Sequence, residues 1–279
     1  MSQYSPVNAE RRSFVDLDRH FHEFTKEELA DEELLAAYNE EHSWHPSLSW
    51  DELLKRKRII VLASAGSGKT EEMEQRKKKL ESERKHAFYV RLEELGQDGF
   101  VDLLKPNERQ QFHEWQSAPS TPAWFFLDSV DELKLTQRTL ESAFRHLTQA
   151  LHKDLHRSHI IVSSRPTDWR PASDETKFRE WLPLPAVLEE NQASADEVFL
   201  AALSRRGLND HESRKTSSEA QDQRVTTVLL LPFAERQIKN FARQWNVTNP
   251  DQVFQEITKN NAWSFARRPL DLIELISLN

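Results

Sequence analysis

Short apolar runs rich in β-branched and aromatic residues recur along the chain, and stretches with apolar residues at helical spacing separate them. Runs of this kind are typical of strands that are buried on both faces. Strands that alternate with helices usually form a parallel sheet, because each helix carries the chain back across one face of the sheet. The pattern therefore predicts an α/β fold with a five-stranded parallel sheet. The predicted strands are residues 58–63, 86–92, 123–127, 159–162 and 226–231.

The chain before the first predicted strand has a different pattern. Thr25 is followed three residues later by Glu28, which is the spacing of a capping box, and Leu and Ala then repeat at helical spacing. Residues 1–49 are therefore predicted to be a helical extension that ends in a linker. We expect the strand-rich core to occupy residues 50–231.

Two later segments depart from the alternation of strands and helices. Residues 172–224 contain scattered Pro and a polar run without clear periodicity, so we predict an insertion with a mobile part. Residues 232–279 repeat apolar positions at helical spacing and are predicted to form a small helical subdomain. Because the sequence stops within an apolar helix, we expect this subdomain to be truncated.

Composition narrows the class of protein. With 37% hydrophobic and 30% charged residues, the 279-residue chain can bury a core and does not have the composition of a disordered protein. It has no Cys, hence no disulfide framework, and we expect a cytoplasmic protein. No stretch approaches the ~20 apolar residues of a membrane span. The net charge of −8 comes from mixed acids and bases and does not favour nucleic acid as a partner.

The sequence ASAGSGKT follows the first predicted strand and precedes a predicted helix, which is the context of a phosphate-binding loop. Glycine at 66 and 68 lets backbone N–H groups turn toward phosphate oxygens, and the helix adds the positive end of its dipole. In such loops the Lys reaches the β- and γ-phosphates and the Thr hydroxyl binds Mg²⁺. The predicted nucleotide-binding residues are Ser64, Ala65, Gly66, Ser67, Gly68, Lys69 and Thr70.

The alternative interpretation of this segment is a Gly/Ser-rich turn that ends in Lys-Thr by chance. Ala63 replaces the first Gly of the usual pattern, at a position that ends the strand. Only five Gly occur in the whole chain, and two of them fall in this loop. The phosphate-binding interpretation is therefore favoured.

Acidic residues follow the predicted strand AWFFL. Asp128 lies at its carboxyl tip, on the edge where α/β sheets bind ligands, and is predicted to share Mg²⁺ with Thr70. Asp131 and Glu132 would bring further carboxylates near the γ-phosphate, and Glu132 is the first choice to orient or deprotonate an attacking water. Taken alone, such acids are ordinary turn and helix-start residues. The upstream loop favours the catalytic interpretation.

A further polar group ends the predicted strand at residues 159–162. Arg165 follows this strand at the same sheet edge, where it could reach the γ-phosphate and sense hydrolysis. Taken alone, Arg165 is equally well interpreted as a surface arginine before a Pro turn. The eleven His do not form H-E-x-x-H or a carboxylate-partnered set, so a metal hydrolase is not favoured.

Taken together and in this order, ASAGSGKT, FFLDSVDEL, IIVSSRP and RRPL resemble the motif set of the NACHT class of STAND NTPases. The resemblance covers most of the chain from residue 50 to residue 278, apart from residues 172–224. It implies a P-loop NTPase three-layer sandwich with a five-stranded parallel sheet, followed by a helical subdomain. In this family, the residue that matches Ser129 is usually Gly, Arg165 matches the sensor arginine, and Pro269 matches a proline that packs near adenine.

The resemblance implies a regulatory switch that binds ATP or ADP with Mg²⁺, hydrolyses ATP slowly and forms a homo-oligomer when an unknown trigger activates it. Similar bacterial proteins serve in antiphage defence, and similar animal and plant proteins serve in innate immunity. Two alternatives stay open: a nucleotide-gated scaffold without useful turnover, and a DNA-acting P-loop ATPase. No NKxD-like guanine motif accompanies the loop, which favours adenine weakly.

Overall fold

The computed structural model describes residues 16–30, 48–136, 138–184, 224–245, 247 and 249–277. Within these ranges the chain forms one mixed seven-stranded sheet with the strand order β2-β1-β7-β3-β6-β5-β4. Strands β7, β3, β6, β5 and β4 are mutually parallel, whereas β1 pairs antiparallel with β7 and with β2. The strands are β1 (His20–Glu23), β2 (Leu48–Ser49), β3 (Arg58–Leu62), β4 (His86–Arg91), β5 (Ala123–Asp128), β6 (Ser158–Ser164) and β7 (Val225–Leu230).

The five predicted strands are present and parallel, and the sheet contains two strands beyond the predicted five. The added strands come from the segment expected to be a helical extension. Phe21 of β1 lies opposite Leu230 of β7 and is fully buried, so this segment is part of the sheet rather than an appendage to it. The helix expected after Thr25 is described only as α1 (Lys26–Ala30), and residues 31–47 lie outside the described residues.

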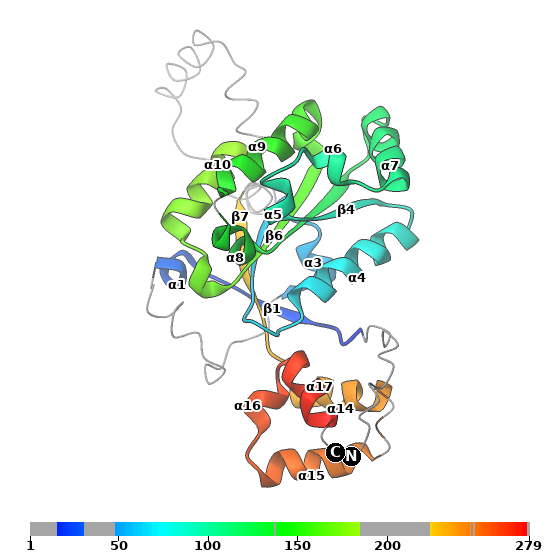
Figure 1. Ribbon diagram of the computed structural model, residues 1–279, viewed down its shortest axis with the longest axis vertical. Coiled ribbons are helices and arrows are strands. Elements are labelled where there is room, and N and C mark those ends of the chain that lie inside the picture. The colour runs from blue at the N-terminus through cyan, green and yellow to red at the C-terminus, as the bar shows by residue number, and fades with distance from the viewer. Residues whose placement is uncertain are drawn as a thin grey trace, which may run out of the picture.

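Helices cover both faces of the sheet, which gives three layers (Figure 1). On one face, α3 (Trp50–Leu53) and α4 (Lys69–Ser82) pack on an apolar cluster that includes Ile59, Val61 and Met73. A larger apolar cluster fills the other face. The helices on that face are α5 (Leu92–Leu95), α6 (Phe100–Leu103), α7 (Pro106–Ser117), α8 (Val130–Leu135), α9 (Leu140–Leu151) and α10 (Thr176–Trp181).

Aromatic side chains dominate the larger cluster. The ring of Phe125, in the middle of β5, stacks on Phe88 at 5.3 Å between centroids and meets the edge of Trp115 at 5.4 Å. Full burial of one such side chain contributes about 2–3 kcal/mol to folding. This packing fixes β5 between β4 and β6 and so determines where the acidic carboxyl tip of β5 lies.

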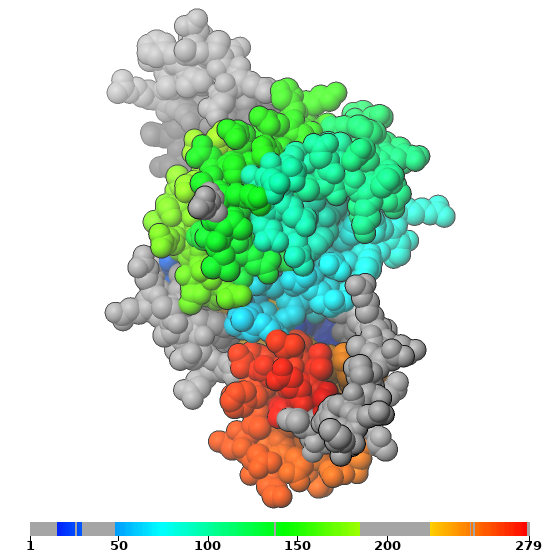
Figure 2. All heavy atoms as spheres, viewed as in Figure 1, coloured from blue at the N-terminus to red at the C-terminus, as the bar shows by residue number. Residues whose placement is uncertain are grey.

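The C-terminal helices form a separate group below the sheet in Figure 1. They bury an apolar cluster of their own, with Phe241 of α14, Ile257 of α15 and Leu272 of α17. Leu17, from the segment before β1, belongs to the same cluster. Figure 2 shows the last of these helices, in red, against the cyan segment that follows β3. The helices are α14 (Glu235–Gln244), α15 (Pro250–Lys259), α16 (Trp263–Ala266) and α17 (Pro269–Ser277).

The expected insertion is only partly described. Residues 172–184 continue η3 (Pro171–Glu175) into α10 and pack on α9, and residues 185–223 lie outside the described residues. Two short helical segments, η1 (His152–Arg157) and η2 (Pro166–Asp168), flank β6. None of the helices in the described ranges has the length and apolar character needed to cross a membrane.

Candidate functional site

The glycine loop lies between the central strand β3 and the start of α4. Gly66 and Gly68 have φ angles of 73° and 83°, a left-handed conformation that other residues rarely adopt. A side chain at Gly66 would also lie 3.3 Å from Leu270, and one at Gly68 would lie 3.4 Å from Pro269. The left-handed backbone therefore favours glycine at both positions, and at Gly66 a Cβ would also be closer than usual to Leu270.

Helix α4 begins at Lys69, and none of the described side chains caps its first N–H groups. An uncapped helix start carries partial positive charge and free donors, which suits an anion. Ser67 is buried, and its N–H donates to the carbonyl oxygen of Ser64 at 3.3 Å, which closes the turn. Ala65 is exposed. The loop thus combines two left-handed glycines with an uncapped helix start, and its role as a phosphate site stays a prediction.

Asp128, at the tip of β5, is surrounded by hydroxyl groups. Thr70 Oγ1 donates to Asp128 Oδ2 at 2.6 Å, and the Tyr89 hydroxyl donates to the same oxygen at 2.9 Å. Ser163 Oγ donates to the other carboxylate oxygen. Burial, and then the nearby Asp128 charge, raise the pKa of Tyr89, so its hydroxyl stays a donor. The sequence predicted that Thr70 and Asp128 meet, but it did not reveal Tyr89 or Ser163.

The donor set around Asp128 fits a magnesium ion. Mg²⁺ prefers oxygen ligands, usually one or two protein oxygens together with phosphate oxygens and water. The Thr70 hydroxyl and the Asp128 carboxylate supply two such oxygens within 2.6 Å of each other, beside the start of α4. Within the described ranges no group of three or more His, Asp or Glu side chains could hold a metal by itself. A metal at this position would therefore need phosphate or water ligands as well.

Asp131 lies between the two cations that the sequence assigns to the phosphates. Its Oδ2 atom is 3.3 Å from Lys69 Nζ and 2.8 Å from Arg165 Nε. Asp131 is 4% exposed, whereas Arg165 is 43% exposed. Asp131 Oδ1 is buried and has no hydrogen-bond partner among the described residues. The geometry of Asp131 is that of an acid that orients cations.

Glu132, the predicted base, is half-buried in the first turn of α8 and follows Asp131 in the sequence. No hydrogen bond or ion pair links it to another described residue, so its carboxylate is available to a ligand or water. It interacts electrostatically with Arg91 at the end of β4. Burial lowers the pKa of Arg91, but Tyr89 and Glu132 outweigh this effect and raise it. Of the three predicted acids, Glu132 is the one without a hydrogen bond or ion pair to another described residue, and its role as the base stays a prediction.

The turn after Asp128 explains how the acids come together. Ser129 is buried and has a φ of 69° and a ψ of 73°, a left-handed conformation that costs a non-glycine residue about 1 kcal/mol. Its N–H donates to Ser163 Oγ at 2.9 Å, which holds the turn. The turn starts α8 at once and so brings Asp131 and Glu132 back toward the tip of β5.

The C-terminal helices contact the loop directly. The N–H of Leu270 donates to the carbonyl oxygen of Gly66 at 3.3 Å, and Pro269, at the start of α17, lies beside Gly68. Pro269 was predicted near the nucleotide, whereas Leu270 was not. A second unexpected contact comes from Arg19, which donates to the carbonyl oxygen of Ser67 at 3.1 Å. A single Arg in a polar segment gives no local signal of such a contact.

The comparisons with known proteins are sparse. No known protein family matches the sequence, and a search of curated proteins found no match. Among solved structures the chain is similar to AMPPCP-bound DnaA from Aquifex aeolicus, with a TM-score of 0.41 and 15% sequence identity. The match covers 80% of this chain and 54% of the DnaA chain, so this chain spans about half the length of that protein. Values this low assign neither a family nor a ligand.

Proposed function

We propose that the chain is a P-loop NTPase module that binds ATP with Mg²⁺ and hydrolyses it slowly. The observation that carries this proposal is the 2.6 Å contact between Thr70, at the start of α4, and Asp128, at the tip of β5. These residues are 58 positions apart: Thr70 lies in the helix that follows β3, Asp128 ends β5, and β6 separates β3 from β5 in the sheet. A phosphate loop and a carboxylate that meet at one sheet edge are what a shared magnesium ion requires.

Each residue at this edge has a proposed role. The amides of the loop and the Lys69 ammonium bind the phosphates, and Thr70 and Asp128 hold the metal. Bound Mg²⁺ supplies positive charge that offsets the charge of the phosphate oxygens. Glu132 orients or deprotonates the attacking water, and Arg165 contacts the γ-phosphate. We assign Asp131 to orientation of Lys69 and Arg165, because its carboxylate already contacts both.

The resemblance to NACHT-type STAND proteins supports a regulatory role for this ATPase. We propose a core at residues 50–231, a helical subdomain at residues 232–279 and a nucleotide that binds between them with adenine near Pro269. The separate apolar cluster of the C-terminal helices and their contact with Gly66 support this division. ATP or ADP would change how the two parts are oriented and so control assembly into a homo-oligomer in signalling or defence.

The test is nucleotide binding and turnover by the purified chain. Lys69→Ala should weaken ATP binding about 100-fold, because a charge-assisted contact to the phosphates is lost. Lys79→Ala is the matched control, since Lys79 lies on the same helix, is half exposed and pairs with Asp51 at 3.7 Å, away from the loop. Equal ATP binding by wild type, Lys69→Ala and Lys79→Ala would refute the proposed site.

Glu132→Gln separates hydrolysis from binding. It should retain ATP and lower turnover about 100-fold or more, because the amide cannot accept a proton from water. Unchanged turnover would show that Glu132 is not the base. Tight ATP binding by a wild-type chain with no measurable turnover would favour the scaffold interpretation.

A further inference from the structure

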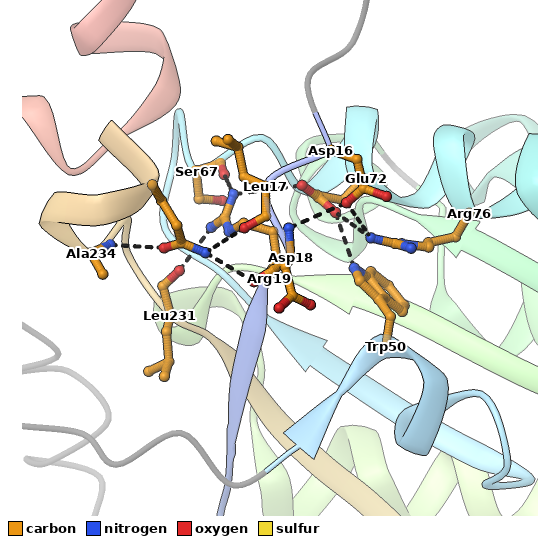
Figure 3. A network of polar contacts seen from close by, with 11 residues as sticks. Asp16, Leu17, Asp18, Arg19, Trp50, Ser67, Glu72, Arg76, Leu231 and Ala234 are labelled. Carbon is orange, nitrogen blue, oxygen red and sulfur yellow. Dashed lines mark hydrogen bonds and ion pairs between the residues drawn. The ribbon is translucent and has the colours of Figure 1, made fainter. Parts of the chain in front are cut away.

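Arg19 is a buried arginine, 1% exposed, in the segment that leads into β1. Its guanidinium donates from Nη1 to the carbonyl oxygen of Ser67 at 3.1 Å and from Nη2 to the carbonyl oxygen of Leu231 at 2.8 Å (Figure 3). Ser67 belongs to the phosphate loop, and Leu231 follows β7. One side chain thus connects three segments that are distant in the sequence.

The contact with Ser67 bears on how the loop binds anions. The Ser67–Gly68 peptide bond is trans, and in a trans peptide the C=O and N–H groups point to opposite sides. Since Arg19 holds the carbonyl oxygen of Ser67, the N–H of Gly68 points away from Arg19. A charged donor on the carbonyl also polarises the peptide group and makes its N–H a stronger donor. Arg19 therefore fixes and strengthens one amide of the proposed phosphate site.

The positive charge of Arg19 is balanced by an acidic residue of α4, the helix that follows the loop. Glu72 of α4 lies 3.8 Å from Arg19 Nη1 and is itself buried. Trp50 Nε1 donates to Glu72 at 3.0 Å, and Arg76 lies 4.0 Å from it. Arg76 also donates to Asp16 at 3.0 Å. Figure 3 shows these side chains converging between the loop and α4.

The same segment is attached to the C-terminal helices. Gln237 of α14 donates from Nε2 to the carbonyl oxygens of Leu17 at 2.9 Å and Asp18 at 3.0 Å, and Leu17 packs in the apolar cluster of these helices. The Arg19 guanidinium lies over the ring of Phe233 at 4.6 Å. Residues 16–19, here called the N-terminal strap, therefore contact both the loop and the C-terminal helices.

We propose that Arg19 is a positioning residue that holds the Ser67–Gly68 peptide in its phosphate-binding orientation and couples it to the C-terminal helices through the N-terminal strap. This inference rests on the proposed nucleotide site. It concerns the phosphate part of the ligand and not the base. A loop that loses this support should bind every ligand that carries a diphosphate less well, whether or not a base is attached.

The experiment compares Arg19→Gln with Arg76→Gln. Both variants remove a buried cation next to Glu72. Of these two arginines, only Arg19 donates a hydrogen bond to the loop within the described residues. Affinities for ATP and for inorganic pyrophosphate are measured with Mg²⁺ by displacement of a fluorescent ATP analogue. Arg19→Gln should weaken both ligands by the same factor, about tenfold, since one charge-assisted support of the loop is lost. Arg76→Gln should change each by less than about twofold.

Two further variants guard against simple unfolding. Arg19→Gln combined with Glu72→Gln leaves no unpaired acid in the buried network and should show the same tenfold loss while melting near the wild-type temperature. Arg19→Lys keeps the charge but cannot reach both carbonyl oxygens at once, so its affinity for both ligands should fall about threefold.

The inference would be overturned if Arg19→Gln and Arg76→Gln lowered ligand affinity equally. It would also be overturned if Arg19→Gln lowered the affinity for ATP but not for pyrophosphate. Wild-type affinity in the folded double variant would overturn it too. These outcomes differ from failure of the proposed function, in which wild type itself binds no ATP or Lys69→Ala binds as well as wild type.

Discussion

The two ends of the parallel strands both bury charged side chains, but the partners of these charges differ. At the amino end, Arg58 is fully buried and donates to backbone carbonyl oxygens, among them Ser158 at 2.6 Å and Leu182 at 2.7 Å. At the carboxyl end, Lys69 and Arg165 pair with the side chain of Asp131.

This difference separates charges that support the fold from charges that a ligand could engage. Backbone carbonyl oxygens are fixed by the strands and helices that carry them, so the hydrogen bonds of Arg58 cannot be exchanged without a change in the fold. Burial lowers the pKa of Arg58 to about 9, which still leaves it charged at neutral pH. Side chains can rotate, and Arg165 is half exposed, so the contacts of Asp131 can be exchanged for contacts with an anion. A ligand at the carboxyl end could therefore engage Lys69 and Arg165, whereas the contacts of Arg58 belong to the fold.

The strongest test of this comparison is Arg58→Met. It should lower the free energy of unfolding by about 3–5 kcal/mol, because several buried carbonyl oxygens lose their donor. Lys69→Met should change it by less than about 1 kcal/mol, since the remaining partner of Asp131 still contacts it. Urea unfolding monitored by tryptophan fluorescence measures both. A similar decrease in the free energy of unfolding in both variants would show that the charges at the two ends of the strands do not differ in this way.

A second test uses pH at the amino end. His159 stacks on Trp124 at 4.8 Å and bonds through Nδ1 to the carbonyl oxygen of Arg56 at 2.8 Å, so Nδ1 carries the proton of a neutral ring. Burial, helped by the charge of Lys57, lowers the pKa of His159 from 6.5 to about 4. The unfolded chain therefore binds a proton that the folded chain excludes, and stability is lost as the pH falls from 6.5 toward 4.

Between pH 7 and pH 5 this effect should lower the free energy of unfolding by about 2 kcal/mol. In His159→Gln the decrease over the same interval should be smaller by that amount. Urea titrations at the two pH values measure the difference. An unchanged pH dependence in the variant would mean that other groups cause it.

A third test compares Asp154 with Asp131, and its expected effect on the free energy of unfolding is smaller. Asp154 pairs with the buried Arg157 at 2.9 Å at the amino end, as Asp131 pairs with Arg165 at the carboxyl end. Asp154→Asn should destabilise the fold by about 1.5 kcal/mol, because a buried charge loses its counterion. Asp131→Asn should cost less than about 0.5 kcal/mol but should alter ATP affinity. Thermal unfolding and ATP titration of both variants test this, and a change in ATP affinity in Asp154→Asn would contradict it.

The smallest expected effect is at Tyr89. Tyr89→Phe removes one of the hydroxyl groups around Asp128 and leaves the ring, so its stability should change by less than about 1 kcal/mol. The Mg²⁺ concentration that supports half-maximal ATP binding should rise about threefold, because the carboxylate is less well oriented. The wild-type chain is the reference, and an unchanged Mg²⁺ dependence in Tyr89→Phe would exclude this role for Tyr89.

The parallel strands could be predicted because burial on both faces leaves a local apolar run in each. The strand β1 could not, since its four residues HFHE have no such run and are a strand only because they pair with β7, some 200 residues later. At the site, the glycine loop and Asp128 have a recognisable local sequence, and the structure places them together. The hydrolytic role of Glu132 stays a prediction.

The residues that the sequence did not reveal are single polar side chains whose meaning depends on distant neighbours. Tyr89 in HAFYVR is indistinguishable from a core aromatic until the register of β4 and β5 brings it near Asp128. Arg19 precedes a short strand and meets the loop 48 residues later. Neither has a spacing or a neighbour in sequence that would single it out.

Ser163 has a consequence for how this edge of the molecule moves. Its hydroxyl donates to Asp128 and accepts from the N–H of Ser129, which ties the tip of β6 to the tip of β5. Arg165 follows Ser163 by two residues on the same strand end. A displacement of the Asp128 carboxylate would therefore be transmitted through Ser163 to the end of β6, where the backbone of Arg165 follows.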